Sequence, residues 1–78
     1  MDIQKLYDIL TELHPEVDFA TAEGLIDNKV LDSFDIVTIL SEVSSQFAVK
    51  IPAGEIVPKN FNSAAALFAL IERLDDED

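Results

Sequence analysis

The chain passes from a long loop into its most clearly periodic helix at Val30-Leu31-Asp32-Ser33-Phe34-Asp35-Ile36-Val37. Either Asp32 or Ser33 is expected to be the N-cap, because a short side-chain oxygen accepts a hydrogen bond from first-turn amides that lack an intrahelical partner. A serine hydroxyl at this position points into solvent at the positive end of the helix dipole, where an attached phosphate is favoured. Ser33 is therefore a suitable attachment point for a phosphodiester.

Working outward from this segment, apolar residues at steps of three and four predict main helices over about 2–13, 33–47 and 63–74. The residues of these stripes are Ile3, Leu6, Tyr7, Leu10 and Leu13, then Ile36, Leu40, Val43 and Phe47, then Leu67, Leu70, Ile71 and Leu74. Val37 and Ile39 are expected to flank the second stripe. The third helix is expected to be capped by Asn62 or Ser63.

The connections between these helices carry further signals. Residues 14–32 form a long loop, which is expected to be held down by the apolar side chains Phe19, Leu25, Ile26, Val30 and Leu31. Asp27-Asn28-Lys29 is typical of a tight turn. Residues 53–57 are expected to form a short helical turn closed by Pro58. Pro15 ends the first helix at His14, which we expect to be a surface residue.

Composition favours one small all-α domain over residues 1–78, a bundle of three main helices and one short one. Apolar residues make up 49% of the chain, which is too many for a disordered protein, and two glycines and three prolines are too few for a turn-rich β fold. A domain of this size is expected to have no deep enzymatic cleft. The acidic residues 75–78 are expected to form a frayed, solvated tail.

Charge and residue content exclude several classes of function. The net charge of −11 repels nucleic acids and anionic lipids, so basic protein surfaces are the expected partners. The absence of cysteine excludes disulfides and thiolate metal sites, and a calcium loop starting at Asp27 fails because Lys29 and Leu31 occupy ligand positions. No metal site is expected. Without a leader or a membrane-length apolar run, the protein is expected to be cytoplasmic, with no stable membrane insertion.

Three short segments resemble the acyl and peptidyl carrier proteins. Asp32-Ser33-Phe34, approached through Leu25-Ile26-Asp27, is similar to their attachment site, and Phe47-Ala48-Val49-Lys50-Ile51-Pro52 is similar to the segment between their second and third helices. Asn60-Phe61-Asn62-Ser63 looks more like the D-alanyl carrier subgroup. The resemblance runs from about residue 6 to residue 74. A glycine frequent shortly before the family's serine is missing, and residues 28–30 occupy that region.

This resemblance implies a stand-alone, monomeric carrier that is not itself an enzyme. A phosphopantetheinyl transferase would move 4'-phosphopantetheine from coenzyme A to Ser33, and the thiol of the arm would hold an acyl or aminoacyl group as a thioester. An adenylating acyl or aminoacyl ligase would load the arm, and downstream acyl-transferring enzymes would receive the group. The residues expected to contact these partners are Asp32, Phe34, Asp35, Thr38 and Ser41.

The second helix departs from the pattern of the fatty-acid carriers, which show several acidic residues along it. Thr38, Ser41, Ser44 and Ser45 stand where more charge is expected. We therefore favour a specialised D-alanyl or secondary-metabolite carrier over the fatty-acid carrier, and the sequence leaves the cargo open.

Other interpretations of the same residues remain. A serine hydrolase would need His14 as its base, and nothing in the spacing places it near Ser33. Ser63 also precedes a helix, but it lacks the preceding aspartate and the entry loop. Phe34 is either partly buried at the helix start or exposed for partners. In the alternative function, the chain is an unmodified acidic adaptor that binds a protein through the Phe34 patch.

Overall fold

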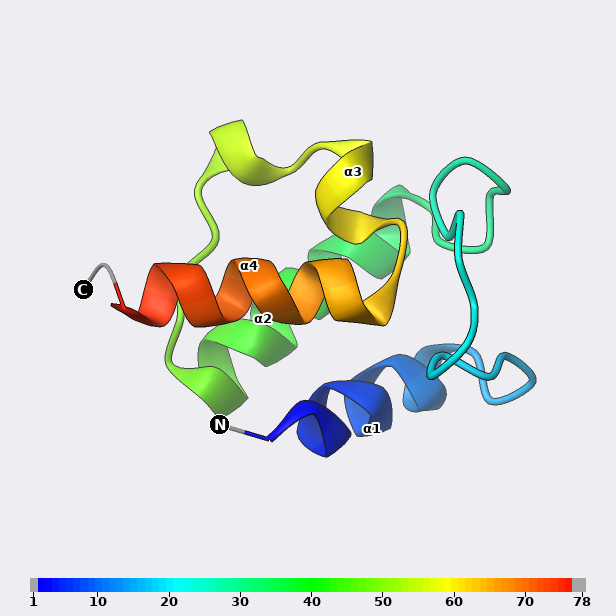
Figure 1. The fold of residues 1–78 in the computed structure, drawn as a ribbon, viewed down its shortest axis with the longest axis horizontal. Coiled ribbons are helices and arrows are strands. Elements are labelled where there is room, and N and C mark those ends of the chain that lie inside the picture. The colour runs from blue at the N-terminus through cyan, green and yellow to red at the C-terminus, as the bar shows by residue number, and fades with distance from the viewer. Residues whose placement is uncertain (1, 77–78) are drawn as a thin grey trace.

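The computed structural model describes residues 2–76, and within them it shows helices and no strand. Its elements are α1 (Ile3–Leu13), α2 (Ser33–Phe47), the short 3₁₀ turn η1 (Ala53–Glu55), α3 (Pro58–Phe61) and α4 (Ala64–Asp76). The predicted small helical bundle is confirmed (Figure 1). Within the same residues, no helix combines the length and the apolar character needed to cross a bilayer.

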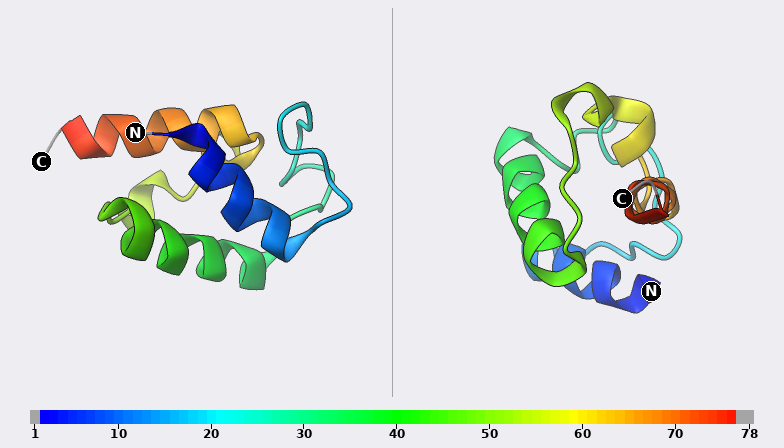
Figure 2. Two further views of the ribbon diagram at one scale, coloured as in Figure 1. Left: turned by 90° about the horizontal axis from the view of Figure 1, so that it is seen from below. Right: turned by 90° about the vertical axis from the view of Figure 1, so that its left-hand side faces the viewer.

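The helices surround a single core. Seen along its long axis, α2 and α4 lie on opposite sides, α1 closes one of the remaining sides, and the segment with η1 and α3 closes the other (Figure 2). α1 packs against both α2 and α4, while α3 packs against α4. The long loop 14–32 leaves the end of α1 and returns to the start of α2, so the start of α2 lies at the loop end of the bundle (Figure 1).

Capping side chains determine where the helices begin. The Asp2 carboxylate accepts a hydrogen bond from the Gln4 amide at 3.0 Å, which starts α1. The Ser63 hydroxyl accepts one from the Ala66 amide at 3.0 Å. Of the two residues expected to cap the last helix, Ser63 is therefore the cap, and the side chain of Asn62 is used elsewhere.

The buried face of α2 is rotated from the predicted one. Ile39 and Val43 are fully buried, whereas Val37, expected to flank the buried stripe, is 64% exposed. The two positions Val37 and Ile39 differ by about 200° around an α-helix, so a face centred on Ile39 leaves Val37 on the solvent side. The prediction that both flank the core was correct for Ile39 and wrong for Val37.

The connection between α2 and α4 differs from the prediction in one respect. The 3₁₀ turn η1 lies inside the expected turn 53–57, but Pro58 begins the helix α3 instead of closing a turn. Proline is well accepted at the first helical position, because its missing N–H has no intrahelical partner there and its φ is already helical.

The last helix extends into the segment expected to fray. α4 includes Asp75 and Asp76, both exposed, while residues 77 and 78 lie outside the described part of the chain. Leu74, one position before, packs against the core and carries the helix this far.

The side chains predicted to hold down the long loop do so. Phe19, Leu25 and Leu31 are at most 4% exposed, and Ile26 and Val30 are partly buried against the same core. The loop is therefore an ordered layer of the domain, and its last residues lead into α2 in a defined direction.

Candidate functional site

Ser33 occupies the first helical position of α2 and is exposed. The preceding Asp32 is the N-cap: its Oδ1 accepts a hydrogen bond from the Asp35 amide at 2.9 Å, and Asp35 Oδ2 accepts one from the Asp32 amide at 3.2 Å. This reciprocal pair is a capping box, which secures the helix start. The Ser33 hydroxyl makes no hydrogen bond to any residue between 2 and 76, so it is available for reaction.

The sequence analysis missed a contact between His14 and this helix start. His14 Nε2 lies 2.7 Å from Asp35 Oδ2, and His14 Nδ1 lies 3.3 Å from Glu16 Oε1. The spacing along the sequence does not indicate this contact, because it forms only when the loop 14–32 brings the end of α1 and the start of α2 together. The His14 side chain is 25% exposed and the Asp35 side chain 16%, so the contact is partly shielded from water.

The contact changes the acidity of both groups. The hydrogen bond to Asp35 raises the pKa of His14 above its ordinary value, burial opposes this, and Glu16 adds to the increase. Burial by itself would raise the pKa of Asp35, but the hydrogen bonds from His14 and from the Asp32 amide together leave it lowered. Both shifts favour the ion pair, as expected for opposite charges in hydrogen-bond contact.

The same geometry argues against a catalytic triad. A serine hydrolase needs a histidine nitrogen facing the serine hydroxyl, with the other nitrogen held by a carboxylate. Here both nitrogens of His14 face carboxylates, those of Asp35 and Glu16, and Ser33 is bonded to neither. His14 is therefore not oriented as the histidine of a Ser33 triad would be.

An apolar surface adjoins the serine. Phe34 is 84% exposed, so of the two interpretations given for it the partly buried one is wrong, and a contact with partners stays a prediction. Val37, one turn further along α2, adds to it. We call Phe34 and Val37 the α2 apolar pair. Contiguous exposed apolar side chains mark candidate surfaces for binding a partner.

The remaining residues predicted to contact partners differ in their availability. Thr38 is exposed, and its hydroxyl donates to the Phe34 carbonyl at 3.0 Å. Ser41 is exposed on the next turn. Asp32 is exposed, but one of its oxygens serves the capping box. The Asp35 carboxylate is directed at His14 and at the Asp32 amide, so its charge is largely satisfied within the domain.

Asn62 fixes the loop that leads to Ser33. Its Oδ1 accepts hydrogen bonds from the amides of Ile26 at 2.9 Å and Asp27 at 3.1 Å, and its Nδ2 donates to Asp27 Oδ2 at 3.2 Å. Its backbone carbonyl accepts from the Leu25 amide at 2.9 Å. The residue considered as a helix cap is therefore a clamp between the junction of α3 and α4 and the loop.

The loop before α2 contains a residue with a left-handed backbone conformation. Lys29 has φ of 59°, in the left-handed region that glycine adopts most easily. The predicted turn is present, with hydrogen bonds from the Asn28 amide to the Gly24 carbonyl and from the Lys29 amide to the Ile26 carbonyl. The chain reaches the start of α2 with a lysine in the conformation that a glycine would otherwise supply.

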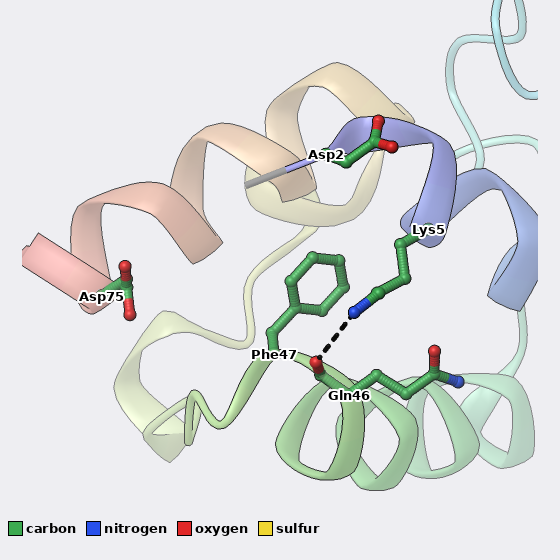
Figure 3. Close-up of a pocket in the computed structure, with 5 residues that line it drawn as sticks. All are labelled: Asp2, Lys5, Gln46, Phe47 and Asp75. Atoms are coloured by element: carbon green, nitrogen blue, oxygen red, sulfur yellow. Dashed lines mark hydrogen bonds between the residues drawn. The ribbon is translucent and has the colours of Figure 1, made fainter.

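Two hollows lie at opposite ends of α2. An apolar one of about 120 Å³ lies near the site and is lined by Ile26, Ile36, Ile56, Val57, Pro58 and Phe61. The other is lined by Asp2, Lys5, Gln46, Phe47 and Asp75 (Figure 3). There, Lys5 Nζ lies 3.5 Å from the Gln46 carbonyl and 5.8 Å from the centre of the Phe47 ring, so it stabilises the C-terminal end of α2.

Metal binding finds no support at either end. Within residues 2–76, no three histidine, cysteine, aspartate or glutamate side chains gather as they would around a metal ion. His14, Glu16 and Asp35 instead satisfy one another through the hydrogen bonds described above.

No family model and no curated protein matched the chain in the comparisons. Among solved structures, the chain is similar to one from a crystal structure of a FAD-dependent dehydrogenase, with 37% sequence identity and a TM-score of 0.67. The match covers 86% of this chain and 92% of the other, so the two are of nearly equal length. This chain therefore belongs to the same protein family as that chain.

Proposed function

We propose that the protein is a stand-alone acyl or aminoacyl carrier that bears 4'-phosphopantetheine on Ser33 and moves thioester-bound intermediates between enzymes. The observation that carries this proposal is the exposed, unbonded Ser33 hydroxyl at the first position of α2, between the two residues of a complete capping box. A phosphodiester at that position faces the positive end of the helix dipole and unpaired first-turn amides. The residues present therefore fit the arm.

The residues of the chain contribute by positioning the arm. The attached arm supplies the thiol that holds the acyl group as a thioester. Asp32 and Asp35 hold the helix start, so the arm swings from a rigid point, and a docked enzyme meets the cargo at a high effective concentration. The α2 apolar pair and the net charge of −11 suit weak, salt-sensitive docking to a basic surface with an apolar depression.

The hollow near the site favours a small cargo. Its volume of about 120 Å³ is below that of an engineered cavity of about 150 Å³ that holds benzene. Ile36, which lines it, follows Ser33 by three residues in α2, so one wall of the hollow lies within one helical turn of the attachment point. This agrees with a specialised carrier loaded by an adenylating ligase.

The similar solved chain suggests one class of partner. Its structure is that of a FAD-dependent dehydrogenase, and a helical chain of 78 residues has little room for a flavin site of its own. We therefore propose a separate flavin-dependent dehydrogenase as a partner, to which the carrier presents its acyl group. The acyl group would lose two hydrogens and the flavin would accept them.

A second candidate is an unmodified adaptor, which the 84% exposure of Phe34 favours. Intact-mass measurement after incubation with coenzyme A and a broad-specificity phosphopantetheinyl transferase separates the two functions. The carrier gains the mass of one arm, Ser33→Ala abolishes the gain, and Ser63→Ala retains it. If the wild-type protein gains no mass under conditions that modify a known carrier, the carrier function is wrong.

A further inference from the structure

His14 joins two helices that are separated by the longest loop of the chain. It directly follows α1, where its backbone amide donates to the Leu10 carbonyl at 3.0 Å. Its ring reaches Asp35, the third residue of α2, at 2.7 Å. One side-chain contact therefore closes the loop 14–32 at its two ends.

The contact acts on the capping box at the start of the serine's helix. The oxygen that faces His14 is Asp35 Oδ2, which is also the oxygen that accepts the Asp32 amide at 3.2 Å. His14 therefore orients the carboxylate that completes the box, and without it the carboxylate keeps only the adjacent Asp32 amide as a hydrogen-bond partner among residues 2–76. Ser33 lies between the two box residues, so its backbone position depends on both.

The surroundings of His14 select its charged form. A neutral imidazole carries one N–H and can donate to one carboxylate, whereas an imidazolium can donate to both Asp35 and Glu16. The ring also follows the C-terminal end of α1, where the helix dipole favours a positive charge. The charged groups that face it are Glu16 from the loop and Asp35 from α2, with Asp32 behind Asp35.

The direction of the pH dependence follows from these contacts. Asp35 raises the pKa of His14. The stabilisation of the folded state by this contact is therefore complete below the pKa of an unfolded-state histidine, and it is lost as pH rises through the raised pKa. The pKa of Asp35 is lowered, so the pair persists in acid until pH falls through that value. The contact is strongest between these two limits.

We propose that His14 is a positioning residue for Ser33: as an imidazolium, it holds the first turn of α2 against the end of α1 and thereby orders Ser33 for attachment of the arm. The effect on arm attachment rests on the proposed carrier function, whereas the ordering of α2 by His14 does not depend on that function. Raising the pH releases the first turn of α2 and slows modification at Ser33.

The test compares His14→Gln and His14→Ala with the wild-type protein. The glutamine variant can donate one neutral hydrogen bond to Asp35 but cannot carry charge. NMR gives the titration midpoint of His14 in the wild type, and hydrogen exchange follows the Asp35 and Ile36 amides, whose acceptors belong to Asp32. Below the midpoint, we expect exchange of both amides in His14→Ala to be about tenfold faster than in the wild type.

The rate of arm transfer to Ser33 is measured over the same pH range. Dividing the wild-type kcat/KM for arm transfer by that of each variant cancels the pH dependence of the transferase itself. Below the His14 midpoint, this ratio should be well above one for both variants. As pH rises through the midpoint, the ratio for His14→Gln should fall toward one. Glu16→Gln keeps the contact of His14 with Asp35 but removes a carboxylate that raises the pKa of His14, so its ratio should stay near one well below the His14 midpoint and depart from one only near that midpoint.

The outcomes separate the two proposals. A ratio near one at every pH, unchanged exchange, or a loss in both variants that does not vary with pH overturns the role of the imidazolium. If His14→Ala does not fold, His14→Gln decides alone. If no protein is modified at any pH, the carrier function fails, while the NMR midpoint and the exchange of Asp35 and Ile36 still test the contact itself.

Discussion

Replacing Asn62 by alanine should release the loop that carries the chain into the candidate site. The substitution removes the oxygen that accepts the Ile26 and Asp27 amides, and it leaves the backbone bond from Leu25 in place. The Ile26 amide is partly buried, so its loss costs about 1 kcal/mol, and the exposed Asp27 amide costs about 0.5 kcal/mol because water replaces the side chain. We expect the free energy of unfolding to fall by about 1.5 kcal/mol in total.

Urea unfolding followed by circular dichroism measures this loss as a lower midpoint with an unchanged slope. For a domain of this size, the melting temperature should fall by about 6 to 12 °C. Amide hydrogen exchange should accelerate first at Ile26 and Asp27, since these are the donors that lose their acceptor.

Asn28→Ala is the matched control. Asn28 lies in the same loop and is exposed, and its side chain makes no hydrogen bond within residues 2–76. Its substitution should change stability by less than about 0.5 kcal/mol. If Asn62→Ala is no more destabilising than Asn28→Ala, or if the Ile26 amide exchanges at the wild-type rate, the assignment of Asn62 as a loop clamp is refuted.

Three further predictions follow from single residues. Ala48 ends α2 with φ of 55°, in the left-handed region that glycine adopts most easily, so Ala48→Gly should raise the free energy of unfolding by about 0.5 to 1 kcal/mol in urea titrations, and a decrease would contradict this conformation. Ile39→Ala should cost about 2 to 5 kcal/mol, whereas Val37→Ala should cost less than about 0.5 kcal/mol, and equal losses would contradict the rotated face of α2. Arg73 donates two hydrogen bonds to Glu55 at 3.0 and 3.2 Å, which lower the pKa of Glu55. Arg73→Gln should therefore raise the Glu55 pKa measured by NMR, and an unchanged value would show that the pair does not form in solution.

Local signals predicted much of the fold. The spacing of apolar residues located α1, α2 and α4, because each helix buries one stripe and a stripe has a fixed period. The acidic residue before Ser33 predicted the helix start, since capping needs only the residues next to it. Pro58 was read as a stop because proline breaks helices, but at the first position of a helix the same ring is favourable.

The features of the candidate site also divide into those that the sequence determined and those that the packing decided. The position of Ser33 at the start of α2 follows from a few neighbouring residues, and the sequence alone determined it. The contact of His14 with Asp35, the clamp formed by Asn62 and the exposure of Phe34 depend on groups 21 to 36 residues apart or on which face of α2 is covered. Periodicity and capping describe one element at a time, so only the packing of the loop and helices decided these contacts.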